Sequence, residues 1–241
     1  MITKVMTGIK RWNAYSTVSQ NNHNTKHKLP ITTSMIRDMV KHLSNSRSDY
    51  LIRAMIWVAT TAMLRISEFT INNTEDDRIL TAGQITFIST INKPLNAVSK
   101  PYAGQIKQLI VHLKASKTDP FRQGIDITIA TPETIKAVCD YIHRTTAQHL
   151  QHKSPFFSTT KGQAINRFWF MRRVNDLLQR CGYDIDQYSS HSFRKGGAVS
   201  LQNMGVEDSL IRTMGRWKSQ AFHLYLRHPI NESIINAGMR M

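Results

Sequence analysis

The sequence contains few cysteines, few acidic residues and no long hydrophobic run. Its 241 residues include only 2 cysteines, and Cys139 and Cys181 belong to no spaced motif. This argues against a disulfide framework or a zinc site built from paired cysteines, and it is typical of a reducing compartment. No apolar run can span a bilayer, and the segment MITKVMTGIKRW lacks the apolar core of a secretory signal. We therefore expect a soluble, intracellular protein with no membrane partner.

The shortage of acidic residues leaves a strongly basic chain. Lys and Arg total 32 against 16 Asp and Glu, which gives a formal net charge of +16. Such an excess points to a polyanionic partner, although ribosomal proteins, membrane-surface proteins and nucleases share it. Metal-dependent DNA cutting needs several converging carboxylates, and the acidic residues here show no ligand-like spacing. The acidic patch Glu75-Asp76-Asp77 is predicted to be a loop, so nucleic acid is indicated and metal-dependent cutting is not.

Hydrophobic periodicity predicts helices around one small sheet, in a compact domain that starts near residue 30. Thr33 or Ser34 can cap the first helix, and a nearly continuous apolar helix follows Ser48 and carries Arg65 at its end. We expect a short amphipathic helix over 1–12 and a polar linker after it. Three strands are predicted at 84–88, 106–113 and 124–130, and further helices near 133–147, 164–181, 191–203 and 206–214.

Cleavage of a phosphodiester without a metal needs positive charge at the non-bridging oxygens, a nucleophile, and a proton donor for the departing 5′ oxygen. Arginine suits the first need, because its permanently charged fork donates two hydrogen bonds to one phosphate. Arg65, in the segment TAMLRISEF, and Arg194 are the candidates. Glu68 could hold the Arg65 guanidinium or a neighbouring histidine in place. A structural role fits Arg65 equally well, with the arginine neutralising the helix dipole and pairing with Glu68.

A histidine and an arginine three residues apart form the second candidate group. His191 and Arg194 share one face of a helix and can address the same phosphate. Ser189 and Ser190 offer an N-cap, and a helix N-terminus favours an anion. The small residues at 196–198 permit a close backbone approach, or they serve simply as helix-packing positions. The context favours a functional pair over one that decorates a solvent-facing helix.

Three further residue types complete the requirements for cleavage. Trp217, in the segment MGRWKS, can donate a hydrogen bond to phosphate but cannot transfer protons, and it could equally fill the core beside Phe222. Tyr225 follows eight residues later and is one of 7 tyrosines, so only its spacing singles it out. Lys114 and Lys117 lie between the last two predicted strands, where a lysine is most often solvated. A lysine near other cations has a lowered pKa and can act as a general acid.

The order of these residues resembles the tyrosine recombinases, the phage integrase family. The similarity extends from Leu29 to about Leu226 and rests on TAMLRISEF, SKTD, SHSFRKGGA and GRW followed by a tyrosine. The spacing between Trp217 and Tyr225 is one residue shorter than in the commoner histidine-containing bacterial pattern. It is similar to versions found in mobile elements of eukaryotes and large viruses.

This resemblance implies an α+β, mostly α-helical catalytic domain with a small three-stranded antiparallel sheet. It also implies metal-independent transfer of DNA strands, with no cofactor, through a 3′-phosphotyrosine bond at Tyr225. The SKTD match favours Lys117 as the acid that protonates the leaving 5′ oxygen. The resemblance also implies that Arg65 and Arg194 stabilise charge and that His191 assists proton transfer. It gives phosphate binding to Trp217 and support of the first arginine to Glu68.

The family's architecture also predicts domains and partners. Members usually clamp DNA between this domain and a helical core-binding domain, of which only residues 1–12 could represent the last helix. We therefore expect the end of a missing core-binding domain at 1–29 and a catalytic domain at 30–241. The expected partners are double-stranded DNA and three further copies in a homo-tetramer, whose contacts the residues after Tyr225 could make. A eukaryotic source would place the protein in the nucleus.

Two other functions remain open at this stage. A type IB topoisomerase uses the same chemistry but relaxes supercoils as a monomer. A non-catalytic DNA-binding remnant of a mobile element would fit the missing N-terminal domain. The sequence favours a recombinase or integrase over this remnant, because all six candidate positions keep a residue able to perform the chemistry.

Overall fold

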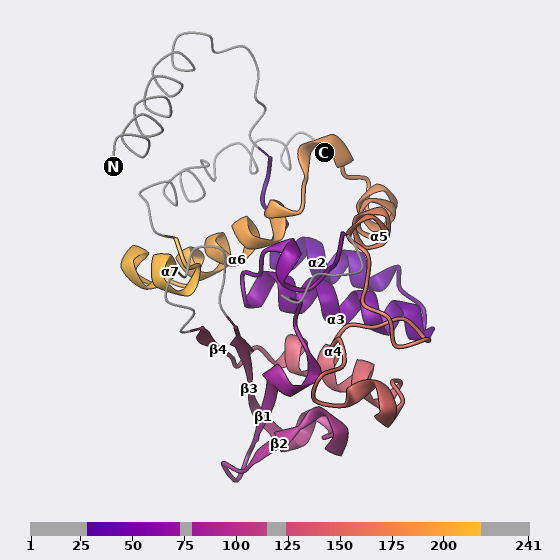
Figure 1. Cartoon of the computed structure of the whole chain (residues 1–241). Coiled ribbons are helices and arrows are strands. Elements are labelled where there is room, and N and C mark those ends of the chain that lie inside the picture. The colour runs from indigo at the N-terminus through magenta and orange to yellow at the C-terminus, as the bar shows by residue number, and fades with distance from the viewer. Residues whose placement is uncertain (1–27, 73–78, 115–123, 218–241) are drawn as a thin grey trace, which may run out of the picture.

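A computed structural model of the chain describes residues 28–72, 79–114 and 124–217 (Figure 1). Several predictions therefore lie outside the described residues: the amphipathic helix at 1–12, the acidic loop at 75–77, and the side chains of Lys117 and Tyr225.

The described chain combines helices with one small sheet, as the sequence predicts. The predicted helices after Ser48 and from 191 to 203 lie close to their expected positions, and the others differ by a few residues at their ends. Pro132 occupies the first turn of its helix, where its missing N–H leaves no hydrogen bond unmade. The elements are α2 (Thr33–Lys41), α3 (Arg47–Thr61), β1 (Ile85–Ser89), β2 (Pro94–Asn96), β3 (Ile106–Leu113), β4 (Ile125–Ile129), α4 (Pro132–His143), α5 (Arg167–Arg180), α6 (His191–Asn203) and α7 (Asp208–Met214).

The sheet has four antiparallel strands in the order β2-β1-β3-β4, so the prediction of three strands is wrong by one. The strand that was not predicted, β2, is only three residues long and lies at the edge of the sheet. It begins with a proline, and its residues stay largely exposed. Three residues with one partly buried side chain are too short to show a hydrophobic period, and proline is tolerated at an edge because no neighbour needs its N–H.

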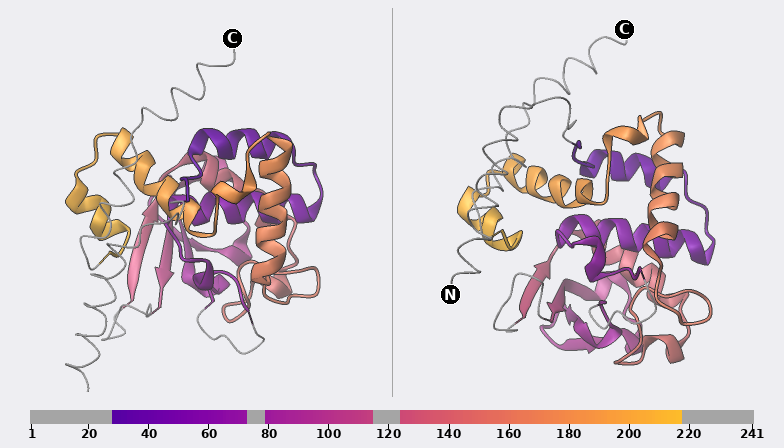
Figure 2. Two further views of the ribbon diagram at one scale, coloured as in Figure 1. Left: turned by 90° about the horizontal axis from the view of Figure 1, so that it is seen from above. Right: turned by 45° about the horizontal axis from the view of Figure 1, so that its top comes forward.

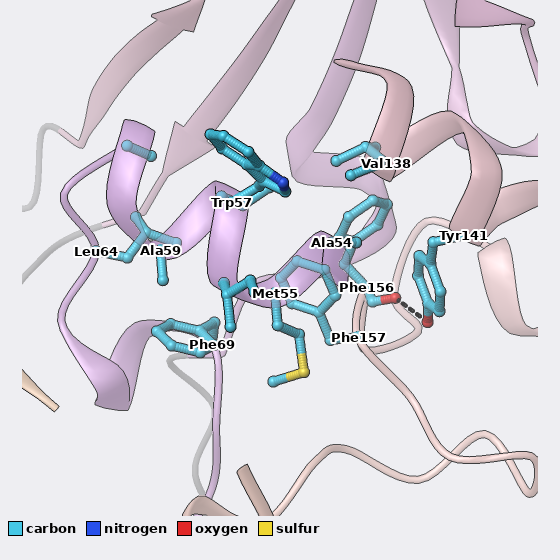
Figure 3. Packing of buried hydrophobic residues seen from close by; sticks show 14 of the residues in the cluster. Ala54, Met55, Trp57, Ala59, Leu64, Phe69, Val138, Tyr141, Phe156 and Phe157 are labelled. Atoms are coloured by element: carbon cyan, nitrogen blue, oxygen red, sulfur yellow. Dashed lines mark hydrogen bonds between the residues drawn. The ribbon is translucent and has the colours of Figure 1, made fainter. Parts of the chain in front are cut away.

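Helix α3 lies at the centre of the domain, and its residues are buried on nearly every side, as its apolar sequence predicts. It contacts α4 on the sheet side and α6 on the other side, and the right-hand view of Figure 2 shows this layering. Figure 3 shows Met55 and Trp57 of α3 among aromatic side chains from later in the chain. The buried Tyr141 hydroxyl donates to the Phe156 carbonyl at 2.9 Å, which satisfies its polar atom.

The first helix begins one residue earlier than its predicted caps allow. Thr32, rather than Thr33 or Ser34, is the N-cap, and its Oγ1 accepts a hydrogen bond from the Met35 N–H at 3.2 Å. All three positions carry a hydroxyl, so sequence alone could not choose among them. None of the helices in the described ranges is long and apolar enough to cross a membrane.

Two glycines let α6 approach the rest of the domain closely. A Cβ at Gly196 would overlap the carbonyl oxygen of Ile31, and one at Gly197 would overlap that of Thr60 and lie 2.7 Å from Met63 Cγ. The small residues at 196–198 are therefore packing positions that seat α6 on the end of α3. The first residues of α6 include His191 and Arg194, so this packing also positions the candidate site.

Replacing Gly196 with alanine should lower the free energy of unfolding by about 2 kcal/mol, because the backbone must move to admit the methyl group. At a helical glycine with free space around it, the same change would raise the free energy of unfolding by about 1 kcal/mol. The sign of the change therefore shows whether the backbones are in close contact. Urea unfolding followed by circular dichroism measures the difference. Gly104→Ala is the control, since nothing lies within 4 Å of its added Cβ. Equal midpoints for the two variants would contradict the close approach.

Candidate functional site

The sequence predicts Arg65 at the end of α3, and this prediction is wrong. The helix ends at Thr61, and Met63 has a left-handed backbone with φ of 45°. Arg65 then begins a short 3-10 turn over Ile66–Glu68. This break turns the chain and leaves the Arg65 side chain 25% exposed at the surface. The continuous apolar run masks the break, because the residues after Thr61 are also buried.

Glu68 holds Arg65 by two contacts. Its Oε2 accepts the Arg65 backbone N–H at 2.8 Å, and its Oε1 accepts Arg65 Nη1 at 3.0 Å. The predicted support of Arg65 by Glu68 is therefore present as an ion pair. The carboxylate also accepts Nη2 of Arg216 at 2.9 Å and is only 12% exposed. One buried carboxylate thus serves two arginines.

Arg194 is anchored to the same end of α3. Its side chain is buried, with Nη1 donating to the Met63 carbonyl at 2.8 Å and Nη2 donating to the Gly215 carbonyl. Its guanidinium lies 4.6 Å from the centre of the Trp217 ring, within the range of a cation–π contact. Trp217 also packs against the small apolar cluster of Met63, Ala198 and Ile211, so it fills space as well as flanking the arginine. Its alternative neighbour Phe222 is outside the described residues.

His191 is exposed at the first position of α6. Its backbone N–H donates to Ser189 Oγ at 3.3 Å, whereas the side chain of Ser190 makes no cap hydrogen bond. Partial desolvation lowers the pKa of His191, and so do the cations at Arg194, Arg167, Lys195 and Arg65, in that order. The imidazole is therefore neutral near pH 7 and can accept a proton.

The arrangement concentrates positive charge. Arg65, Arg194 and Arg216 gather around the end of α3, and Glu68 is the carboxylate that pairs with two of them. Burial lowers the pKa of Arg216, although Glu68 favours its charged form. Converging cationic side chains favour an anionic ligand, because a bound anion offsets the mutual repulsion of the arginines. A phosphate group fits this electrostatic demand and the geometry of arginine.

The structure brings together Arg65, Glu68, Arg194 and Trp217 from distant parts of the chain, with His191 on the same helix as Arg194. Lys117 and Tyr225 lie outside the described residues, but β3 and β4, which flank Lys117, pair up to Leu113 opposite Ile125. Sequence reasoning missed Arg216 and Arg167. No local pattern marks Arg216, because its partners lie 148 to 154 residues earlier in the chain. Within the described ranges, no three His, Cys, Asp or Glu side chains gather as metal ligands.

Comparison with solved structures places the fold. No family model matches the chain, and no curated protein matches it significantly in sequence. The XerA recombinase is similar over 91% of this chain and 66% of its own, with 13% identity and a TM-score of 0.55. The XerH site-specific recombinase, bound to its difH substrate before cleavage, is similar over 88% of this chain and 54% of its own, with 11% identity and a TM-score of 0.57. The Tn1549 transposon integrase with circular intermediate DNA is similar over 91% and 67%, with 13% identity and a TM-score of 0.52.

These similarities show that the chain has the tyrosine recombinase fold, which confirms the resemblance predicted from the sequence. The chain spans about half to two thirds of the length of these structures. At such low identity the likeness concerns the fold, so activity must be argued from the residues of the site.

Glu68→Gln should destabilise the domain by about 3 kcal/mol, because two arginines lose the charge that compensates them in a buried setting. Glu133→Gln is the matched control. Its partner Arg37 is 58% exposed, so the loss there should stay below about 1 kcal/mol. Denaturant unfolding of both variants measures the difference. Equal, small losses would show that Glu68 does not hold the arginine cluster together.

Proposed function

We propose that the protein is a site-specific DNA recombinase or integrase that cleaves and rejoins strands through a 3′-phosphotyrosine bond at Tyr225. The observation that carries this proposal is the cluster of Arg65 and Arg194 at the end of α3, with Trp217 against the second arginine, within a tyrosine recombinase fold. The XerH and Tn1549 structures contain DNA, which supports double-stranded DNA as the partner. The proposed assembly is a homo-tetramer on two duplexes.

The chemistry assigns one role to each residue. The Tyr225 hydroxyl oxygen attacks the phosphorus, and the bond from phosphorus to the 5′ oxygen breaks. Arg65 and Arg194 stabilise the charge on the non-bridging oxygens, and Trp217 donates a hydrogen bond to one of them. The neutral imidazole of His191 accepts the tyrosine proton, while Lys117 protonates the departing 5′ oxygen. Attack by a 5′ hydroxyl from another strand reverses these steps and releases Tyr225.

The proposed domain boundaries follow from this function. Residues 30–241 form the catalytic domain, and residues 1–29 form the end of a core-binding domain. The described part of this unit already contains the fold and four of the proposed catalytic residues: Arg65, His191, Arg194 and Trp217. Recognition of a particular target sequence requires contacts to base edges or to DNA shape, which basic residues that meet phosphates do not supply.

A nicked-duplex substrate traps the covalent intermediate, because the short strand that leaves cannot return. Wild-type protein with chelator present should form an adduct that survives denaturation, and Tyr225→Phe should form none, since it lacks the attacking oxygen. Tyr102→Phe, at a tyrosine that is 67% exposed, is the matched control and should react like the wild type. Denaturing gels with labelled duplexes from the source genome provide the measurement.

The outcomes separate the alternatives. Duplex binding without any adduct, on every substrate tested, would favour the non-catalytic remnant. Relaxation of a supercoiled plasmid by the monomer, without exchange between two duplexes, would favour the topoisomerase. An adduct that persists in Tyr225→Phe would assign the nucleophile to another residue.

The lowered pKa of His191 predicts the pH dependence of cleavage. The single-turnover rate should rise with pH through a value below 6.5 and be level near pH 7, because the acceptor must be neutral. His191→Gln should lower the plateau about 100-fold and abolish this acidic limb. Rates of adduct formation from pH 5 to 8 test the prediction. If the acidic limb of the pH–rate profile remains in His191→Gln, it arises from the titration of another group.

A further inference from the structure

Arg216 is a buried arginine that the proposed chemistry does not use. It lies between Gly215, the C-cap of α7, and Trp217. Its backbone has a left-handed φ of 57°, which is uncommon for a residue with a side chain. The side chain is only 7% exposed. A long, charged side chain at a tight turn normally extends into water, so its burial here needs a reason.

The guanidinium of Arg216 reaches the end of α3 and the turn that follows. Nη1 donates to the Ala62 carbonyl at 3.3 Å, and Nη2 donates to the Met63 carbonyl at 3.0 Å. Nη2 also donates to Glu68 Oε2 at 2.9 Å. The last carbonyls of a helix carry partial negative charge, so a cation is stabilised there. Arg216 therefore ties the end of α3 to the carboxylate of Glu68.

Two of these acceptors, the Met63 carbonyl and the Glu68 carboxylate, also bind the arginines that are proposed to contact phosphate. The Met63 carbonyl accepts Nη1 of Arg194 at 2.8 Å, and Glu68 accepts both the backbone and the side chain of Arg65. Arg216 thus connects an anchor of Arg194 with an anchor of Arg65. A shift of its guanidinium would move the Met63 carbonyl and the Glu68 carboxylate together.

We propose that Arg216 is a positioning residue, which fixes Arg65 and Arg194 relative to each other so that both can bind one phosphate. The inference rests on the proposed function, because the phosphate is that of the DNA strand to be cleaved. It adds to the site a residue that supplies orientation without contacting the substrate.

Three features of Arg216 are unfavourable for a residue that only fills space. Its Nε is buried without a hydrogen-bond partner, its backbone is left-handed, and burial lowers its pKa. An apolar side chain of similar volume would avoid both the orphaned donor and the desolvation of a charge. Strain and unsatisfied polar groups of this kind concentrate at functional sites, where precise geometry matters more than stability.

A double-mutant cycle on duplex binding tests the proposal without relying on catalysis. Arg65→Ala should weaken binding several-fold and reduce the salt slope by about one, the loss of one phosphate contact. Arg216→Met should cause a similar loss, and the double variant should lose little more, because Arg216 acts through Arg65 and Arg194. Arg180→Met removes an equal charge from an exposed pair with Asp176 and serves as control. Losses that multiply in the double variant, or wild-type binding by Arg216→Met, would overturn the proposal.

Arg216→Lys keeps the charge but cannot span two carbonyls and a carboxylate with a planar fork. It should therefore bind DNA like Arg216→Met, and it replaces that variant in the cycle if thermal unfolding shows that the methionine prevents folding. Full binding by Arg216→Lys would show that charge alone suffices and would overturn the positioning role.

Adduct formation supplies a second, chemical test. Arg216→Met should lower the maximal rate about 100-fold, because misplaced arginines stabilise the transition state poorly. A neutral methylphosphonate at the scissile position should restore most of this rate, as it should for Arg65→Ala. A neutral phosphonate has no charged oxygen for two aligned arginines to stabilise, so the variant should react with it at nearly the wild-type rate. A variant with a general folding defect would react slowly with both substrates. If wild-type protein forms no adduct on either substrate, the proposed function fails and the binding cycle alone decides the role of Arg216.

Discussion

The carbonyl of Met63 is the point on which the candidate site depends. Helix α3 ends at Thr61, and the left-handed backbone of Met63 turns the chain, so the Met63 carbonyl lies beyond the last helical turn. Arg194 and Arg216 both donate to the Met63 oxygen, and they come from α6 and from the turn after α7. The helix itself is closed by backbone hydrogen bonds, from the Met63 N–H to the Thr60 carbonyl at 3.1 Å and from the Leu64 N–H to the Ala59 carbonyl at 3.0 Å, and the two arginines bind the Met63 carbonyl that follows. The same contacts hold those arginines beside Arg65, so the ending of one helix organises the site.

The packing of α6 makes this arrangement possible and extends it toward the N-terminus of the domain. Gly196 and Gly197 lack the side chains that would separate α6 from Ile31 and from the end of α3. The Ile31 N–H donates to the Ser192 carbonyl at 2.9 Å, and Lys195 Nζ donates to the Lys28 carbonyl at 2.6 Å. The segment by which the chain enters the domain is therefore fastened to the helix that carries His191 and Arg194. A displacement of that segment would therefore also move the first turn of α6.

The features predictable from the sequence were those with a local period or a short spacing. The alternation in β3 and β4, the apolar length of α3 and the three-residue spacing of Arg65 and Glu68 all lie within one segment. Three features could not be predicted, since each depends on contacts between distant segments or on a pattern too short to detect. The edge strand β2 has only three residues, the end of α3 lies within an apolar run, and the acceptors of Arg216 lie far from it in the sequence. The sequence therefore identified candidate residues for the chemistry, but it did not identify Arg216, which contacts two of the groups that hold them.

The ion pair of Arg65 with Glu68 does not weigh against a functional role for the arginine. A purely structural pair would be complete with one cation and one carboxylate, yet Glu68 is shared with Arg216, and Arg194 is bound nearby through neutral carbonyls. Desolvating several cations opposes folding, and apolar side chains would fill the same volume at lower free energy. An anion bound between these arginines would offset their repulsion and add favourable contacts in the bound state alone. The convergence of three arginines at the end of α3 is therefore the feature on which the proposed phosphate-binding role rests.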